Sequence, residues 1–425
     1  MTSSLRFADL TVELSLQADP APVGLDLATP GRGGDAVYEW SVDLLSPDPD
    51  TRLVTWRLRR RDGGSFTVGP FAARVRVPAI DVHRVFVPVL HDGIGKRDWI
   101  SLPWGVKERT FATWSFPLIA LLNRRDRSRF CMGLMDHVHV AETTQSCYDE
   151  DACLELSRPE PRQTRCWEDG VYLSRAPRPV FDEIRAFARA HRALHAQQAA
   201  PAPAAAWDPV WCSWYGIKTQ VDAAYVGRLA PLLADWGFGS VIVDAGWFRE
   251  DGFDAETGHY VPDTAKFPDL AALVRQVQAH GLRLLLWYAP LFGLGGIRHH
   301  PFVERHLFRP GDGADGPLFL CPRSPAVRDY ACRTVRHLLG TYGADGLKVD
   351  FIDPLMDRAC LPCTADHAHD IEDYGEAIVA LLQGIREAAT SVRSDALLEF
   401  RMNYEGGLTG PPGVPALPGV DRQAA

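Results

Sequence analysis

A lysine and two aspartates interrupt a short apolar segment at residues 346–353, GLKVDFID. Apolar residues alternate with Lys348 and Asp350, and a period of two is typical of a β-strand. Burying charged groups is costly, so they must either pair or serve a chemical purpose. A strand places Lys348 and Asp350 on one face, where the ammonium would keep the carboxylate ionised, as a nucleophile requires. The alternative is an ion pair between these two side chains that only stabilises the fold.

Short apolar segments alternate with longer amphipathic segments from Trp207 onward. This alternation predicts parallel strands covered by helices, in either a doubly wound sheet or a (β/α)8 TIM-type barrel. No Gly-x-Gly-x-x-Gly turn follows the first strand, so a dinucleotide site has no support. A barrel directs the C-terminal ends of all its strands to one site. We therefore favour the barrel, with Leu347, Val349 and Phe351 facing its packed outer layer.

The side chains at the predicted strand ends are of the types that bind sugars. The apolar faces of a pyranose stack on aromatic rings, and carboxylates bind its hydroxyls. We therefore predict a carbohydrate site in which Asp350 is the nucleophile or the acid. The strand ends carry Trp211 and Trp214, Asp244 and Trp247, Trp287 and Tyr288, Lys348 and Asp350, and Arg401 and Asn403.

The length of 425 residues predicts two or three domains. Alternating segments before residue 170, such as 53–59, predict a β-sandwich. We expect an N-terminal β-sandwich domain with a C-terminal helix at 1–197, an Ala/Pro linker at 198–206, strands one to five of a catalytic barrel at 207–404, and an irregular tail at 405–425. The fold class is therefore multi-domain, β plus α/β, with a barrel that is incomplete.

Composition excludes several classes of function. The net charge is −9 and basic residues are scattered, so neither nucleic acid nor a membrane surface is expected as a partner. The first residues lack the pattern of a secretion signal and no apolar run has membrane-spanning length, which predicts a cytoplasmic protein. Nine cysteines at irregular spacing favour reduced thiols over a disulfide framework.

The segments WCSWYG, VIVDAGWF, LLLWYAP, GLKVDFID and ALLEFRMNY resemble, in order and strand position, the melibiase-like retaining α-glycosidases of glycoside hydrolase family thirty-six, clan D. The resemblance covers about residues 207–404, and the preceding sandwich also resembles that family's N-terminal domain. Its most specific part is the Lys-x-Asp motif after a helix that ends in Tyr-Gly. The resemblance implies an α-galactosidase-like enzyme of carbohydrate catabolism that acts on an oligosaccharide or α-glycoside and requires no cofactor.

The family's functional residues carry over to matching positions. The resemblance implies that Asp350 is the nucleophile and that Lys348 binds sugar hydroxyls. Asp244 matches the first aspartate of the Asp-Asp-Gly-Trp motif, and Trp287 matches a tryptophan of the glycone pocket. Arg401 lies on the strand where the family places a substrate-binding arginine, within a different local motif. Trp214 and Trp247 complete the predicted substrate-binding residues, and no metal ligand is predicted.

Three departures from the family pattern matter. Ala245 replaces the second aspartate of Asp-Asp-Gly-Trp, so galactose is not assured as the glycone, and EFRMNY replaces a glycine-rich segment. The family's acid/base aspartate lies on a sixth strand, whereas the recognisable strands stop at Tyr404, and nothing places Asp421 at a strand end. We therefore expect a truncated or frame-shifted hydrolase that folds poorly alone or associates, as a homo-oligomer or otherwise. Alternatives are another α-glycoside hydrolase or transglycosidase, such as a glucosidase, and a non-catalytic sugar-binding remnant.

Cysteines and histidines also cluster in CLPCTADHAH, which contains Cys360, Cys363, His367 and His369. These are zinc-ligand types, but classical fingers separate their two pairs by about a dozen residues. We therefore favour free residues in the loop after the nucleophile strand over a metal site.

Overall fold

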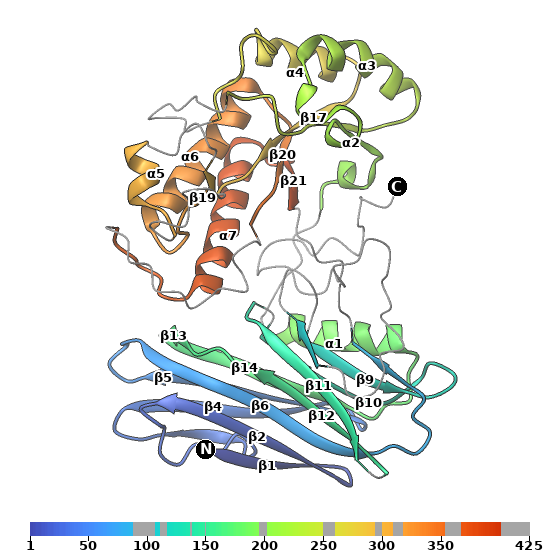
Figure 1. The fold of residues 1–425 in the computed structure, drawn as a ribbon, viewed down its shortest axis with the longest axis vertical. Coiled ribbons are helices and arrows are strands. Elements are labelled where there is room, and N and C mark those ends of the chain that lie inside the picture. Colours follow the sequence, from blue (N-terminus) through green and yellow to red (C-terminus); the bar gives the residue numbers. More distant parts are fainter. Residues whose placement is uncertain are drawn as a thin grey trace. The chain divides into compact units, whose positions relative to one another are not determined.

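The structure is a computed structural model, and it describes two units, one up to residue 194 and one from residue 202 on. Each unit is described by itself (Figure 1). Arg401, Asp421, Cys360 and Cys363 lie outside the described residues, as does the expected tail. The described ranges are 1–87, 107–110, 117–136, 138–148, 150–194, 202–249, 260–293, 300–308, 318–352 and 367–400.

The first unit contains two antiparallel sheets, each of seven strands. One sheet has the order β1-β2-β6-β12-β11-β8, with β13 paired to β6, and the other has the order β3-β4-β5-β14-β10-β9-β7. The first sheet comprises β1 (Thr2–Phe7), β2 (Leu10–Asp19), β6 (Phe66–Pro78), β8 (Lys107–Thr110), β11 (Ala141–Tyr148), β12 (Asp151–Arg158) and β13 (Arg162–Thr164). The second comprises β3 (Gly31–Gly34), β4 (Tyr38–Asp48), β5 (Thr51–Arg60), β7 (Arg84–Phe86), β9 (Leu118–Leu122), β10 (Ser128–Leu134) and β14 (Cys166–Ser174).

A shared apolar core joins these two sheets face to face. Alternate residues of β1 and β2 are buried, as a half-buried strand requires. Leu14 and Phe71 of one sheet and Trp56 and Trp167 of the other belong to a single cluster, and the Trp56 and Trp167 rings lie 5.3 Å apart. Helix α1 (Val180–Leu194) covers the other face of the second sheet, where Phe187 is fully buried. This arrangement is a β-sandwich with a following helix.

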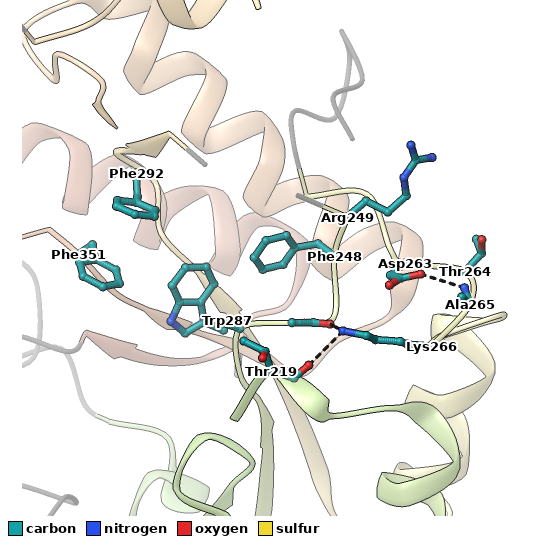
Figure 2. A pocket seen from close by; sticks show the side chains of 12 residues that line it. Thr219, Phe248, Arg249, Asp263, Thr264, Ala265, Lys266, Trp287, Phe292 and Phe351 are labelled. Carbon is teal, nitrogen blue, oxygen red and sulfur yellow. Dashed lines mark hydrogen bonds between the residues drawn. The ribbon is translucent and has the colours of Figure 1, made fainter. Parts of the chain in front are cut away.

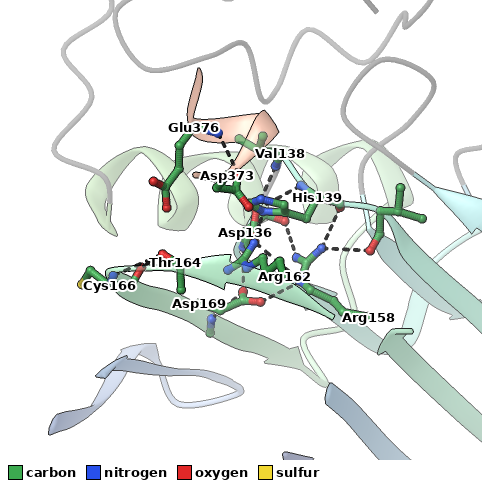
Figure 3. A network of polar contacts seen from close by, with 12 residues as sticks. Asp136, Val138, His139, Arg158, Arg162, Thr164, Cys166, Asp169, Asp373 and Glu376 are labelled. Atoms are coloured by element: carbon green, nitrogen blue, oxygen red, sulfur yellow. Dashed lines mark hydrogen bonds and ion pairs between the residues drawn. The ribbon is translucent and has the colours of Figure 1, made fainter. Parts of the chain in front are cut away.

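A buried ionic network lies at one end of the sandwich strands (Figure 3). Arg162 Nη1 donates to Asp136 Oδ2 at 2.7 Å, and Arg158 Nε donates to Asp169 Oδ2 at 2.8 Å. His139 Nδ1 lies 2.7 Å from the Asp136 carboxylate. Burial by itself raises the pKa of Asp136, but the cationic groups of Arg158, His139 and Arg162 outweigh it and hold that pKa well below its usual range.

The second unit is built around a five-stranded parallel sheet, whose strands follow one another in the order β15-β16-β17-β20-β21. The sequence prediction of parallel strands alternating with helices is therefore confirmed, although a closed barrel is not seen within the described ranges. The strands are β15 (Val210–Cys212), β16 (Ser240–Val243), β17 (Arg283–Tyr288), β20 (Gly346–Val349) and β21 (Leu397–Phe400), and a small pair is formed by β18 (Phe292–Gly293) and β19 (Leu318–Phe319). The helices are α2 (Trp214–Ile217), α3 (Ala223–Asp235), α4 (Leu270–Gln278), α5 (Pro301–Arg305), α6 (Pro325–Tyr342) and α7 (Tyr374–Val392), with 3-10 turns η1 (Ala204–Trp207) and η2 (Lys218–Gln220).

Helix starts in this unit follow ordinary capping chemistry. Asp222, Asp269 and Asp373 precede α3, α4 and α7, and each side chain accepts a hydrogen bond from the backbone N–H three residues later.

In the parts of the chain that the structure describes, we find no helix that is long and apolar enough to cross a membrane.

The two faces of the parallel sheet differ in character. Leu284 and Leu286 of β17 are fully buried on one face, and α4 contacts this strand. On the other face, Ile242, Leu285 and Leu397 form an apolar cluster with Ala206 of η1. The next residues along this second face, two positions further toward the C-terminal strand ends, are those with chemistry. This second face is therefore apolar in the middle of the sheet and polar at the C-terminal ends of its strands.

Candidate active site

Asp244 and Lys348 form a buried ion pair on this second face, at the C-terminal ends of the strands. Asp244 follows β16, and Lys348 lies on β20 in register with Trp287 of the intervening strand β17. Lys348 Nζ and Asp244 Oδ2 are 2.6 Å apart, and the two side chains are 5% and 3% exposed. The two partners thus meet across the strand that separates them. A buried pair of this kind requires additional hydrogen bonds to its remaining polar atoms.

Hydrogen bonds from neighbouring residues orient the Asp244 carboxylate. Oδ1 accepts from the Ala245 N–H at 2.8 Å, and Oδ2 accepts from the Cys212 thiol at 3.2 Å. The Asp244 N–H donates to Ser213 Oγ at 2.9 Å. Cys212 pairs in register with Ile242, two residues before Asp244, which places the thiol and the carboxylate on the same face of the sheet. Three strands therefore build the surroundings of one carboxylate.

Electrostatics keep Lys348 charged. Burial by itself lowers the pKa of Lys348, but the Asp244 carboxylate, with the Asp350 carboxylate contributing, outweighs burial and raises that pKa above its ordinary value. Burial and the Asp244 carboxylate raise the pKa of Cys212 to about 12, so the thiol stays neutral and acts as a donor. An ammonium with three donors beside a carboxylate is suited to binding vicinal hydroxyl groups.

Asp350 is held directly beyond the end of β20. Its backbone N–H donates to the Tyr288 carbonyl at 2.8 Å, which continues the pairing with β17 past the last strand residue. Asp350 Oδ2 accepts from Trp287 Nε1 at 3.0 Å, and Oδ1 accepts from the Phe351 N–H at 2.9 Å. The residue is 5% exposed. Both carboxylate oxygens are therefore fixed in direction, as a nucleophile requires.

The expected outward orientation of Phe351 is wrong. Its φ of 51° lies in the left-handed region, so the chain leaves strand geometry directly after Asp350 and the alternation of faces ends. Phe351 instead lines a cavity of about 660 Å³, and its ring stacks on Phe292 with a centroid distance of 4.9 Å. Leu347 and Val349 are fully buried, as expected.

Aromatic rings form one side of this cavity and polar groups the other (Figure 2). Trp287 stacks on Phe248 with an interplanar angle of 14°. On the polar side, Lys266 Nζ donates to the Thr219 and Gly246 carbonyls at 3.0 and 3.2 Å. Trp287 connects the cavity with the carboxylate, because its ring lines the cavity while its indole N–H holds Asp350.

The structure brings four of the predicted site residues together, namely Asp244, Trp287, Lys348 and Asp350. Trp247 is fully buried, and its Nε1 donates to the Trp287 carbonyl at 3.1 Å, so it supports Trp287 rather than facing the cavity. Trp214 lies on the short helix α2 rather than at a strand end and is 38% exposed. Arg401 falls outside the described residues.

Sequence reasoning missed three members of this region. Cys212 and Ser213 are not among the predicted site residues, although Cys212 directly follows Trp211 in the first predicted strand. Glu399 pairs in register with Lys348 and therefore belongs to the same face of the sheet. The strand pattern alone could have found Glu399, because it occupies the second position before Arg401.

Part of the chain is similar in sequence to known glycosidases. No protein-family model matches the chain. The chain is 26% identical over 178 residues to a probable alpha-galactosidase G from Emericella nidulans, covering 38% of this chain and 24% of that protein. It is 27% identical over 154 residues to the myogenesis-regulating glycosidase of Mus musculus, covering 36% of this chain and 18% of that protein. The chain thus spans about a quarter or less of these curated relatives.

Solved structures match over nearly the whole chain. The GH36 α-galactosidase AgaA from Geobacillus stearothermophilus superposes with a TM-score of 0.55 at 16% identity, covering 96% of this chain and 61% of that one. The α-galactosidase TtGalA from Thermus thermophilus, in complex with p-nitrophenyl α-D-galactopyranoside, gives 0.54 at 19% identity, covering 99% and 73%. The chain has the fold of the GH36 α-galactosidases. The resemblance to this group is thereby confirmed.

Proposed function

We propose that this chain carries the nucleophile and the glycone-binding groups of a retaining α-glycosidase of the α-galactosidase type. The observation that carries the proposal is the arrangement of Asp350, Trp287, Lys348 and Asp244 on three adjacent parallel strands. A fixed carboxylate lies beside an aromatic ring, with an ion pair at the same level. We also propose that the five parallel strands belong to a (β/α)8 barrel, which is supported by the GH36 fold and by the sequential strand order.

Each residue has a defined role in this mechanism. The Asp350 carboxylate attacks the anomeric carbon, the bond from that carbon to the leaving oxygen breaks, and a covalent glycosyl-enzyme forms. The Trp287 N–H orients Asp350, and the ring stacks on the sugar. Lys348 and Asp244 bind hydroxyl groups on the far side of the glycone. Water then attacks the same carbon from the face of the departed group, the bond from that carbon to Asp350 breaks, and the water gives up a proton, so the configuration is retained and the Asp350 carboxylate is regenerated.

The leaving oxygen must also gain a proton. Retention requires a second carboxyl group about 5 to 5.5 Å from the nucleophile. Within the described ranges we assign no residue to this role. A substrate whose leaving group departs without protonation is therefore the suitable probe of the chemistry that this part of the chain supplies.

The proposed substrates are α-galactosides. Related solved structures contain raffinose, bound to a variant of AgaA, and stachyose, bound to TtGalA. A second candidate, activity on another α-glycoside, rests on Ala245, because its methyl group offers no hydroxyl contact where the family pattern has an aspartate.

Hydrolysis assays test the proposal. The purified chain is given p-nitrophenyl α-galactoside, α-glucoside and β-galactoside, and nuclear magnetic resonance follows the first-formed anomer. We expect α-glycoside hydrolysis that releases the α-anomer first, lost in Asp350→Asn and kept in Asp235→Asn, a change of an exposed aspartate at the end of α3. Preference for the glucoside would select the second candidate. Activity that survives in Asp350→Asn would refute the nucleophile, and sugar binding without turnover in calorimetry would favour a non-catalytic binding protein.

A further inference from the structure

A cysteine and two histidines converge in the second unit, and the proposed mechanism uses none of them. Cys321 follows β19, whereas His367 and His369 precede α7, 48 residues later for His369. Cys321 Sγ lies 3.5 Å from His369 Nε2, and the two Nε2 atoms of His367 and His369 are 3.1 Å apart. All three potential donor atoms lie within 4.8 Å of one another. Cys321 is fully buried and the two histidines are half-buried.

These separations match the edges of a tetrahedral metal site. With Zn–N bonds of about 2.05 Å and a Zn–S bond of about 2.3 Å, tetrahedral angles give about 3.3 Å between two nitrogens and about 3.5 Å between nitrogen and sulfur. The observed distances of 3.1 and 3.5 Å lie close to these values. The third edge, from Cys321 Sγ to the nearest His367 nitrogen, is no longer than 4.8 Å. One cation can therefore contact all three atoms.

The orientation of His367 also favours a ligand role. Its Nδ1 lies 2.8 Å from the Arg305 carbonyl at the end of α5. Because a carbonyl can only accept, Nδ1 carries the proton, and the lone pair is on Nε2, which faces the cluster. A backbone carbonyl on the second ring nitrogen is the usual partner of a metal-bound histidine. The His306 ring packs beside His367, with centroids 5.3 Å apart.

Ion pairs and backbone bonds fix the two segments to each other. Arg328 of α6 donates to both Asp370 carboxylate oxygens, at 2.7 and 2.6 Å, and also to the Pro322 carbonyl at 2.7 Å. The Cys321 N–H donates to the His306 carbonyl at 2.8 Å. Residues on either side of the ligands are therefore already joined, and little ordering remains for metal binding to impose.

We propose that Cys321, His367 and His369 form a zinc-binding site, with water as the fourth ligand. One thiolate and two imidazoles in a tetrahedral arrangement are a donor set that suits Zn²⁺, whereas Mg²⁺ and Ca²⁺ take oxygen ligands. On binding, the Cys321 S–H bond breaks, the proton passes to solvent, and the thiolate bonds the metal. The site ties the segment before α7 to the segment before α6. This proposal does not depend on the glycosidase activity.

Metal uptake by the untagged full-length chain tests the proposal. The chain is purified, dialysed against a chelator and then against zinc chloride, and its zinc content is measured by mass spectrometry at several free zinc concentrations. We expect one zinc per chain. His367→Ala and His369→Ala each weaken binding by more than about a hundredfold, since loss of an outer-shell partner alone costs about ten- to a hundredfold. His280→Ala, which changes an exposed histidine of the same unit, leaves binding unchanged.

Cobalt substitution tests the cysteine separately. Co²⁺ in the site gives visible bands of tetrahedral intensity and a near-ultraviolet thiolate-to-metal band. Cys321→Ser removes the thiolate band, whereas Cys332→Ser, a half-buried cysteine of α6, keeps it. Circular dichroism of the metal-free variants shows whether each variant is folded. Alanine is better tolerated at the half-buried His367 than at the fully buried Cys321. Three results would each overturn the proposal. They are no zinc uptake by the wild-type chain, zinc uptake that persists in a His367→Ala/His369→Ala double variant, and a thiolate band in Cys321→Ser. The three side chains would then form only a hydrogen-bonded cluster.

Discussion

The Lys348 ammonium and the Asp244 carboxylate lie 2.6 Å apart, although β17 separates their strands. Both groups project from the same face at the same register level, so they meet above the intervening strand. The ion pair expected as the structural alternative, between Lys348 and Asp350, would have joined two residues of a single segment. The observed pair instead connects two strands and leaves Asp350 to be held by Trp287.

Removal of one member of this pair is expected to destabilise the second unit. Lys348→Met leaves the Asp244 carboxylate buried without its cation, which costs about 3 to 5 kcal/mol of unfolding free energy. Urea unfolding measures the loss, and Arg228→Ala, at an exposed position of α3, should change it by about 0.5 kcal/mol or less. The double variant Lys348→Met/Asp244→Leu should recover much of the stability. Equal losses in Lys348→Met and Arg228→Ala would show that the pair contributes nothing.

The ionic network of the sandwich predicts a specific dependence of stability on pH. The folded-state pKa of Asp136 is lowered, because its three cationic neighbours outweigh burial. The contribution of this network to the free energy of unfolding is therefore present above the unfolded-state pKa of an aspartate, about 3.9. It is lost as the pH falls from there toward the lower folded-state pKa of Asp136. Urea unfolding followed by the fluorescence of the buried Trp56 and Trp167 should show this loss in the wild-type chain.

Asp136→Asn removes the titrating group and should flatten that part of the pH profile, with lower stability already at pH 7. Asp43→Asn, at an exposed position of β4, is the matched control and should keep the wild-type slope. If Asp136→Asn retains the full acid-dependent loss, other carboxylates are responsible and the assignment to Asp136 is wrong.

Gly346 allows the last two described strands to pair closely. A β-carbon at this position would lie 1.9 Å from the Leu397 carbonyl oxygen, a backbone atom that cannot rotate away. Gly346→Ala should therefore force β20 and β21 apart and cost more than about 3 kcal/mol, comparable to severe core overpacking. Gly216→Ala has no atom within 4 Å of the added carbon and serves as the control. Thermal unfolding that is the same for both variants would contradict this close pairing of β21 with β20 in solution.

Trp287→Phe separates the two roles proposed for this side chain. The ring remains to stack on a sugar, but the N–H that holds Asp350 Oδ2 is lost. A hydrogen bond to a charged acceptor is worth about 1.5 to 3 kcal/mol, so glycosylation should slow by about ten- to a hundredfold with a smaller change in sugar affinity. Trp236→Phe, at a position that is 67% exposed, should leave both unchanged. A loss confined to affinity would indicate that Trp287 only stacks.

Hydrophobic periodicity was sufficient to predict that parallel strands alternate with helices and that Leu347 and Val349 are buried. It failed where the backbone leaves regular geometry, because a left-handed residue at Phe351 ends the alternation without any glycine to signal it. It also could not group Cys321 with His367 and His369. Their proximity depends on the packing of α5, α6 and the segment before α7, not on a local spacing.

Covalent trapping of Asp350 is the most direct measurement of the central claim. An α-galactosyl donor with a leaving group that needs no protonation, and with fluorine substituents that slow hydrolysis, is incubated with the chain before proteolysis and peptide mass spectrometry. The account predicts one added glycosyl group on the peptide that contains Asp350, absent in Asp350→Asn and present in Asp235→Asn. Labelling of a different residue, or no labelling at a sugar concentration that saturates binding, would contradict it.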